Sequence, residues 1–375
     1  MTFSENIFSD YKKYKEQSIL NRRFKHKDIL SLIEKRNSKV FKTSVVGKSF
    51  EGREIFMLKA GFGKTKVMLW SQMHGNEPTA TAALFDIFNF LEGSQNFSDE
   101  INTIFKNCTL YFIPMLNPDG AEQFKRRNAQ DVDINRDALR LESPEAKILM
   151  QLTDKINPDF GFNLHDQDIW YSAGDTKYPA TLSFLTPAFD DEKNLNESRK
   201  KSMQLIADMN NMLQNFIPEQ IGRYSDDFMS TAFGDNIQKR GTSTILIESG
   251  GFVDDPEKQF VRKLNFTAIL HALYSISRNA YKKYVFRDYE NIPLNKKNKL
   301  FDYILRHAVL LKNDMKYTAD IGIRNKSLSD KDMFEVDDIG DLSQNFAYKE
   351  IDMNNEETIP VNIGDDASFL IQNYF

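Results

Sequence analysis

Ionisable and polar residues follow four apolar segments of this 375-residue chain, each directly after the segment ends. The four runs are Met73-His74-Gly75-Asn76-Glu77 after residues 66–72, Leu116-Asn117-Pro118-Asp119-Gly120 after 109–114, His165-Asp166-Gln167 after 160–164, and Glu248-Ser249-Gly250-Gly251 after 243–247. A lone histidine after a strand is usually a hydrogen-bonded loop residue, and Asn-Pro-Asp-Gly is an ordinary turn. Four such runs in one chain indicate a shared site.

The residue types in these runs suit a metal ion. Two histidines and one glutamate form the ligand set of many catalytic zinc sites, in which water takes the fourth position. His74, Glu77 and His165 supply that set here. Glu248 is then left over as a general base, which would take a proton from a metal-activated water. Cys108 is the only cysteine, so a thiolate cage is excluded. We therefore predict one Zn²⁺ per chain.

The segments around these residues alternate between strand and helix patterns. The four apolar segments read as strands, and residues 79–91, 143–156 and 261–280 read as helices. Residues 43–60 indicate a hairpin around Gly52. This alternation predicts a mixed sheet covered by helices on both faces, which is a three-layer α/β/α domain. Because ligands bind beyond the carboxyl ends of strands in such sheets, the four runs would meet at one edge.

Three parts are expected along the chain. Residues 1–40 carry apolar residues among many charges, which is the pattern of amphipathic helices preceding a main domain. Residues 41–284 hold the alternating pattern and form the expected catalytic domain. Residues 285–375 change to short β-prone pieces separated by turn residues, which predicts a small β-rich C-terminal domain.

Composition and charge narrow the class of partner. With 41% hydrophobic and 27% charged residues, the chain can bury an ordinary core. Its 49 Lys and Arg against 54 Asp and Glu give a formal charge of −5, so it lacks the basic surface of a nucleic-acid binder. No apolar run reaches the length of a signal peptide or membrane span, and the single cysteine suits a reducing compartment. We expect a cytoplasmic protein that binds a small or peptide-sized molecule, not nucleic acid or membrane, in an oligomeric state that the sequence does not indicate.

The order of His74-x-x-Glu77, Asn135-Arg136, His165 and Glu248 resembles the M14 zinc carboxypeptidase family. The resemblance covers about residues 40–280, and it extends to Ser49-Phe50-Glu51-Gly52-Arg53, Asn117-Pro118-Asp119-Gly120 and residues 126–137. It implies a zinc carboxypeptidase-like fold and hydrolysis of a C-terminal peptide bond. His74, Glu77 and His165 would be the zinc ligands, and Glu248 the general base and acid.

The same resemblance implies further roles. Asn135 and Arg136 would hold the terminal carboxylate of the substrate, for which a bidentate guanidinium is suited. Asp133 matches the acidic residue that orients the first zinc-binding histidine. Arg127 is the candidate for the cation that stabilises the tetrahedral oxyanion, with Arg126 as the alternative.

Two features differ from the well-studied digestive members of the family. Those enzymes follow the third ligand with Ser-Tyr, whereas Asp166-Gln167 stands here, so that part of the substrate wall differs. The family also has a mobile tyrosine that caps the substrate. Tyr224 is the nearest candidate for it, and Tyr171 and Tyr178 are alternatives.

Two other functions share some of these features. An N-acyl amino acid deacylase of the aspartoacylase or succinylglutamate desuccinylase type resembles the same fold, has the same His-Gly-Asn-Glu opening and carries a β-rich C-terminal domain. A binding module that has lost catalysis is disfavoured, because every ligand and the base are present. The Asn-Pro-Asp-Gly and Glu-Ser-Gly-Gly segments favour the peptidase. We therefore expect a metallocarboxypeptidase whose substrate is a peptide, or an acyl amino acid in the alternative, with a free carboxylate.

Overall fold

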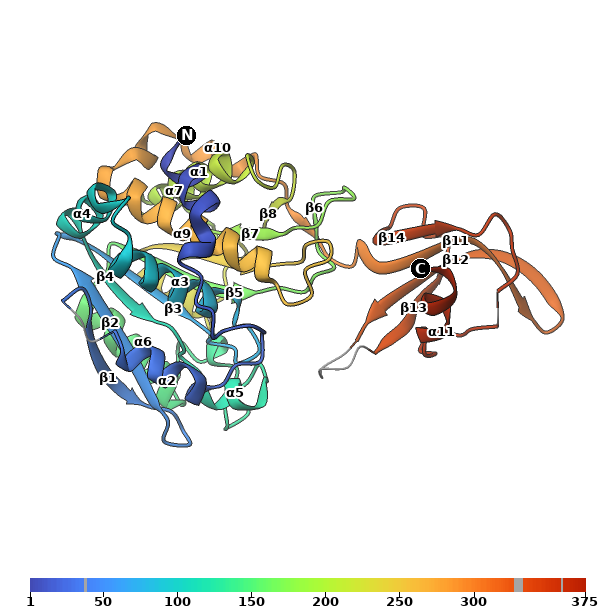
Figure 1. The fold of residues 1–375 in the computed structure, drawn as a ribbon, viewed down its shortest axis with the longest axis horizontal. Coiled ribbons are helices and arrows are strands. Elements are labelled where there is room, and N and C mark those ends of the chain that lie inside the picture. Colours follow the sequence, from blue (N-terminus) through green and yellow to red (C-terminus); the bar gives the residue numbers. More distant parts are fainter. Residues whose placement is uncertain (37–38, 327–332, 359) are drawn as a thin grey trace. The chain divides into compact units, whose positions relative to one another are not determined.

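The structure is a computed structural model that describes residues 1–36, 39–326, 333–358 and 360–375. Residues 37–38, 327–332 and 359, which fall in the expected N-terminal helical and C-terminal β-rich parts, lie outside the described residues. The chain folds into two compact units. The first contains Met1–Gln167 and Thr181–Leu294, and the second contains Asp168–Ala180 and Asn295–Phe375 (Figure 1).

The first unit is built on a mixed sheet that has eight strands within the described residues, in the order β1-β2-β4-β3-β5-β9-β7-β8. The strands are β1 (Lys42–Lys48), β2 (Glu54–Gly61), β3 (Thr65–Ser71), β4 (Cys108–Ile113), β5 (Phe160–Asp166), β7 (Leu182–Leu185), β8 (Ile221–Arg223) and β9 (Ser243–Ser249). The central strands β4, β3, β5 and β9 are parallel, whereas β2 pairs with β4 and β7 pairs with β9 in antiparallel fashion. β5 is buried along its whole length, as expected for a strand covered on both faces.

Helices cover both faces of this sheet. They are α1 (Phe3–Asp10), α2 (His26–Glu34), α3 (Thr79–Gly93), α4 (Ser98–Asn107), α5 (Pro118–Gln123), α6 (Pro144–Ile156), α7 (Glu197–Leu213), α8 (Phe233–Lys239), α9 (Gln259–Arg278) and α10 (Phe286–Glu290), with 3₁₀ turns η1 (Tyr11–Lys13), η2 (Ile134–Arg136) and η3 (Ala280–Lys283). α6 begins at a serine cap, because the Ser143 side chain accepts a hydrogen bond from the Ala146 amide and Pro144 takes the first turn. Across the described ranges, no helix combines the length and apolar character that a membrane crossing requires.

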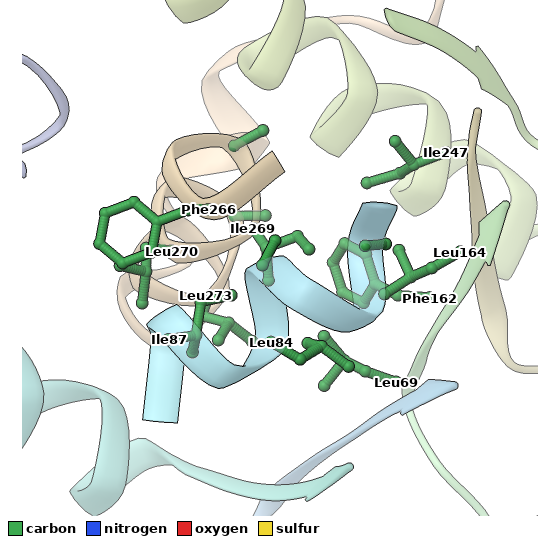
Figure 2. Close-up of a cluster of buried hydrophobic side chains, with 14 of the residues drawn as sticks. Leu69, Leu84, Ile87, Phe162, Leu164, Ile247, Phe266, Ile269, Leu270 and Leu273 are labelled. Carbon is green, nitrogen blue, oxygen red and sulfur yellow. The ribbon is translucent and has the colours of Figure 1, made fainter. Parts of the chain in front are cut away.

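The larger core lies between the sheet and the packed pair α3 and α9. Figure 2 shows side chains from three strands and both helices meeting there: Leu69 of β3, Phe162 and Leu164 of β5, Ile247 of β9, Leu84 and Ile87 of α3, and Phe266, Ile269, Leu270 and Leu273 of α9. α3 is buried on nearly all sides, which explains why apolar residues occur around its whole circumference. A second core on the other face joins Met68 and Trp70 of β3 to residues of α6 and α8. The predicted three-layer α/β/α fold is confirmed.

The second unit contains a smaller mixed sheet, which has both antiparallel and parallel strand pairs. Its elements are β6 (Ser172–Ala173), β10 (Asn295–Lys296), β11 (Leu300–Lys312), β12 (Met315–Asn325), β13 (Phe334–Gly340), β14 (Phe346–Asp352) and α11 (Ser368–Tyr374), and the main strands follow the order β13-β12-β11-β14. Residues 168–180 belong to this unit although they come from the middle of the chain. The Trp170 indole N–H donates to Asp302 over 2.9 Å, and β6 pairs with β10. The predicted small β-rich domain is therefore also confirmed as part of the fold.

Candidate active site

The central parallel strands bring the predicted residues to one edge of the sheet. β3 and β5 are neighbours, and β5 is followed in the sheet by β9. His165 of β5 is the register partner of Glu248 of β9, so their side chains lie on the same face of the sheet. His74 and Glu77 lie in the loop that follows β3. The strand order changes direction beside β3, which is where α/β sheets place their ligands.

Close backbone packing shapes the loop that carries His74. A Cβ atom added to Gly75 would lie 2.0 Å from the carbonyl carbon of Gly120, so the two backbones can meet only at glycine. The Asn117 amide donates to the carbonyl of Met73 over 3.1 Å and accepts from the Gly120 amide over 2.8 Å. The Asn-Pro-Asp-Gly run therefore acts by holding the histidine loop in place.

Asp119 of the same run binds the early hairpin. Its carboxylate accepts hydrogen bonds from the Ser49 hydroxyl at 2.7 Å, the Glu51 amide at 2.9 Å and the Arg53 guanidinium at 2.7 Å. Asp119 is buried. Two sequence motifs that lie about seventy residues apart are therefore one structural contact, and it fixes the loop beneath the site.

His74, Glu77 and His165 form a buried cluster. The Glu77 carboxylate lies 2.8 Å from the Nδ1 atoms of both histidines, and those two nitrogens are 3.2 Å apart. One ligand atom from each residue lies within 4.8 Å of the others. Burial alone would raise the pKa of Glu77, but the two imidazoles outweigh it and lower that pKa well below its usual range.

Asp133 fixes the orientation of the His74 ring. The Nε2 atom of His74 lies 3.0 Å from Asp133 Oδ1, which leaves Nδ1 facing Glu77 and His165. Burial would lower the pKa of His74, yet the carboxylates of Glu77 and Asp133 raise it. A histidine whose far nitrogen is held by a carboxylate is typical of metal sites, because the contact fixes the tautomer and strengthens the ligand.

This donor set fits a zinc ion. Two imidazole nitrogens and one carboxylate are the ligands that catalytic zinc sites use, with a further position left for water. His165 Nε2 is buried and has no hydrogen-bond partner among the described residues. The contacts of that ring are therefore made through Nδ1, on the side of Glu77 and His74.

Arg126 and Arg127 point in different directions. The Arg126 guanidinium lies 3.0 Å from Glu77 Oε1 and 3.2 Å from His74 Nδ1, and it also binds Asp133. The Arg127 guanidinium donates to the Asp131 carbonyl over 2.8 Å at the surface. The structure therefore brings Arg126 to the cluster and does not bring Arg127 there.

Asn135 and Arg136 lie on η2, the short turn that begins directly after Asp133. The Asp133 side chain caps this turn by accepting a hydrogen bond from the Asn135 amide over 3.0 Å. The side-chain oxygen of Asn135 accepts from the Phe233 amide at the start of α8 over 3.1 Å. Arg136 donates to the Asn135 carbonyl, and the residue is exposed. One short turn thus joins the orientation of His74 to an accessible cation.

Glu248 faces the cluster from β9. Its Oε2 atom is buried without a hydrogen-bond partner within the described part of the chain. Burial raises its pKa well above the usual range, and the charges of Glu77 and Asp166 raise it further, against Lys258 and Arg126. A carboxyl group with a raised pKa is a stronger base, which suits proton transfer near neutral pH.

Tyr224 reaches the segment that follows His165. Its hydroxyl donates to the side-chain oxygen of Gln167 over 2.8 Å, and its amide donates to Phe184 of β7. Tyr171 and Tyr178 belong to the second unit. Among the three candidate tyrosines, Tyr224 is the one in the same unit as the cluster.

Sequence reasoning missed the groups that surround Asp166. The Asp166 carboxylate accepts from the Thr79 hydroxyl over 2.5 Å, and the cations of Arg22 and Lys258 lie 3.4 and 3.5 Å away. Arg22 and Lys258 stand in segments without a recognisable motif. A buried lysine carries no sequence signal of its own, so only the fold reveals it.

Comparison with known proteins places the chain in a family. Residues 26–239, which are more than half of the chain, match the family described as zinc carboxypeptidase. Carboxypeptidase SOL1 of Arabidopsis thaliana is 29% identical over 132 residues, which are 31% of this chain and 27% of that protein. Carboxypeptidase 2 of Trichophyton rubrum is 28% identical over 136 residues, 36% of this chain and 24% of that protein. The matches thus span about a quarter of the length of these curated relatives.

Solved structures agree with this fold. A metallo-carboxypeptidase from Burkholderia cenocepacia aligns with a TM-score of 0.55 and 17% identity, over 68% of this chain and 70% of that one. A metallo-carboxypeptidase from Pseudomonas aeruginosa, in complex with (2-guanidinoethylmercapto)succinic acid, aligns with a TM-score of 0.52 and 17% identity, over 69% and 70%. At this level of sequence identity, the structural similarity shows the fold alone. By its match over more than half of its length, this chain belongs to the M14 zinc carboxypeptidase family.

Proposed function

We propose that this protein is a zinc-dependent metallocarboxypeptidase that hydrolyses the C-terminal peptide, or peptide-like amide, bond of a substrate with a free carboxylate. The observation that carries the proposal is the link through Asp133. This residue binds His74 of the buried cluster, and its own chain presents Arg136 three residues later. A metal-ligand set and a cation for a carboxylate are therefore held at a fixed separation.

His74, Glu77 and His165 would hold one zinc ion per chain. Zinc in such a site supplies Lewis acidity, which activates water and polarises a carbonyl group. Glu248 would accept the proton of the attacking water and return it to the leaving amine, for which its raised pKa is suited. The match to the family ends before Glu248, so this role rests on its position opposite His165.

The remaining residues would bind and orient the substrate. The guanidinium of Arg136 offers two parallel donors to the terminal carboxylate, with Asn135 beside it. Arg126, which already contacts Glu77, would stabilise the charge that develops on the carbonyl oxygen. Tyr224 would close over the substrate from the side of Gln167.

The deacylase stays as a second candidate, because a β-rich unit follows the catalytic residues. A panel of N-blocked dipeptides, their C-terminal amides and N-acyl amino acids separates the two. Wild type is first stripped with a chelator and then titrated with Zn²⁺. We expect hydrolysis of the free-acid peptides only, with activity restored at one zinc per chain. Equal cleavage of amidated and free-acid peptides would refute carboxylate recognition, and preferential cleavage of the acyl amino acids would establish the deacylase.

Matched arginine variants test the assignment within one loop. Arg136→Lys and Arg126→Lys keep the charge but lose the planar fork, so each should lower kcat/KM. Arg127→Lys is the control, because that side chain binds a turn carbonyl at the surface. We expect the control to behave as wild type. A larger loss in Arg127→Lys than in Arg126→Lys would reverse the assignment of the oxyanion cation.

A further inference from the structure

Lys258 is a buried lysine in an unusual backbone conformation. It is 2% exposed, and it stands just before α9 with a φ of +48°. Non-glycine residues rarely occupy this left-handed region, and where they do, the surrounding structure holds them there. Burial lowers the pKa of its ammonium group, so the charge is kept at a cost. An apolar side chain would fill the same space without that cost.

The ammonium group joins the ends of two strands. Its Nζ atom donates to the carbonyl of Ser249 over 2.7 Å and to the carbonyl of Gln167 over 3.1 Å, and it lies 3.5 Å from the Asp166 carboxylate. An ammonium has three donors, and all three therefore have partners. Ser249 directly follows Glu248, and Asp166 directly follows His165.

The strand ladder ends where Lys258 binds. His165 pairs with Glu248 and Asp166 pairs with Ser249, which is the last pair of β5 and β9. The Gln167 amide then donates to the Ser249 carbonyl over 3.0 Å, and Lys258 binds that same carbonyl. Lys258 thus binds the two strands together at the point where their regular backbone hydrogen bonds end.

Asp166 extends the contact to the metal-ligand set. Its backbone amide donates to Glu77 Oε2 over 3.2 Å, and its carboxylate accepts from the Thr79 hydroxyl. A shift of Asp166 would move the Glu77 carboxylate as well as the neighbouring His165 ring. Lys258 is therefore connected to a ligand on β5, to the glutamate after β3 and to the base on β9.

We propose that Lys258 is a positioning residue that sets the separation between the general base Glu248 and the metal ligands His165 and Glu77. The inference rests on the proposed function. The proposed substrate carboxylate site at Arg136 on η2 does not involve Lys258. An effect on substrate binding can therefore be separated kinetically from an effect on the chemical step. Removal of Lys258 should lower kcat and leave KM nearly unchanged.

The test compares two buried cations of the same helix region. Lys258→Met removes the ammonium and keeps a flexible side chain. Arg262→Met is the matched control, because Arg262 is also buried near the start of α9 but pairs with Asp86 away from the site. Lys258→Met should lower kcat about 10- to 100-fold, as small misplacements of reacting groups do, with KM within about twofold. Arg262→Met should lose at least as much thermal stability, with normal kcat per folded molecule.

Cobalt substitution gives a readout that does not depend on turnover. Co²⁺ loaded in place of zinc should show an altered visible absorption spectrum in Lys258→Met and the wild-type spectrum in Arg262→Met. If Lys258→Met does not fold, Lys258→Gln carries the comparison, since its amide still donates two hydrogen bonds. A folded Lys258 variant with normal kcat and a wild-type cobalt spectrum would overturn the proposal. Wild type that binds Co²⁺ but hydrolyses nothing would refute the proposed function instead, and the spectra would still decide the role of Lys258.

Discussion

Two buried charge clusters of the first unit differ in how completely their atoms are bonded. In one, Arg262 binds both oxygens of Asp86, Tyr11 and the Glu16 amide bind the same carboxylate, and Arg262 also donates to backbone carbonyls. In the other, Asp166 Oδ1, Glu248 Oε2 and His165 Nε2 have no hydrogen-bond partner in the portion of the chain described.

This difference distinguishes a cluster that stabilises the fold from a cluster that is available for chemistry. Buried polar groups are almost always hydrogen-bonded, so a group of unpaired ones in one place needs an explanation. The Asp86 cluster is complete without any ligand and ties the N-terminal segment to α3 and α9. The cluster around Glu248 leaves polar atoms open beside a metal-ligand set. Lys258 and Arg262, four residues apart, serve one cluster each.

The largest effect is expected at Glu248. Glu248→Gln keeps the shape and removes the base, so kcat should fall by about 10²- to 10⁴-fold, the usual worth of general acid–base catalysis. Zinc content should stay normal, and stability should stay equal or rise, because the cost of burying an ionisable carboxyl group is removed. Steady-state kinetics, metal analysis and thermal unfolding of one preparation check all three. Loss of zinc together with activity would instead make Glu248 a ligand.

At Asp86 we expect the opposite result, namely a loss of stability with unchanged activity. Asp86→Ala leaves Arg262 buried without its partner carboxylate, which should cost about 3–5 kcal/mol of unfolding free energy. Activity per folded molecule should not change, because the Asp86 cluster lies apart from His74, Glu77 and His165. Urea unfolding and kinetics at low temperature measure the two quantities. A fall in kcat equal to that of Glu248→Gln would remove the distinction between the two clusters.

A smaller effect is expected at Asp133. Asp133→Ala removes the carboxylate that holds His74 Nε2, so zinc affinity should fall about 10- to 100-fold. Competition with a chromogenic chelator measures the dissociation constant. Asn196→Ala, which removes the side-chain cap of α7, is the control for general destabilisation. Equal zinc affinities of wild type and Asp133→Ala would show that Asp133 does not act on the metal ligand.

The fold and the central part of the site could be predicted because they depend on short-range patterns. The apolar segment 66–72 became β3 and the helical spacing of 79–91 became α3, each within two residues of the expected ends. His74, Glu77, His165 and Glu248 follow such strands, and parallel strands end at one edge. Their convergence thus follows from the alternation of strands and helices alone.

Side-chain direction and long-range contacts could not be predicted in this way. Arg126 and Arg127 are adjacent and chemically identical, and the turn closed by the Asp131 carbonyl decides which one reaches the cluster. Residues 168–180 follow His165 closely in sequence, yet their partners, such as Asp302, lie more than a hundred residues later. Such contacts leave no periodic pattern, so they appear only when the chain is folded.

A third buried carboxylate gives the last and smallest test of the comparison. Asp235 is 6% exposed, and burial raises its pKa to about 6, although the Met229 amide donates to it. The unfolded chain releases this proton near pH 3.8, whereas the folded protein keeps it up to about pH 6. Between these values the folded state binds more protons, so stability must fall as the pH rises.

Asp235→Asn stays neutral and can still accept the hydrogen bond. The variant should therefore equal wild type at pH 4 and be about 1–3 kcal/mol more stable at pH 7. Trp70 lies in the first unit and Trp170 in the second, so urea unfolding followed by tryptophan fluorescence in a Trp170→Phe background, with chelator present, reports on the first unit. A constant difference at all pH values would mean that the pKa of Asp235 is the same in the folded and the unfolded chain, so that burial of this carboxylate does not make stability depend on pH.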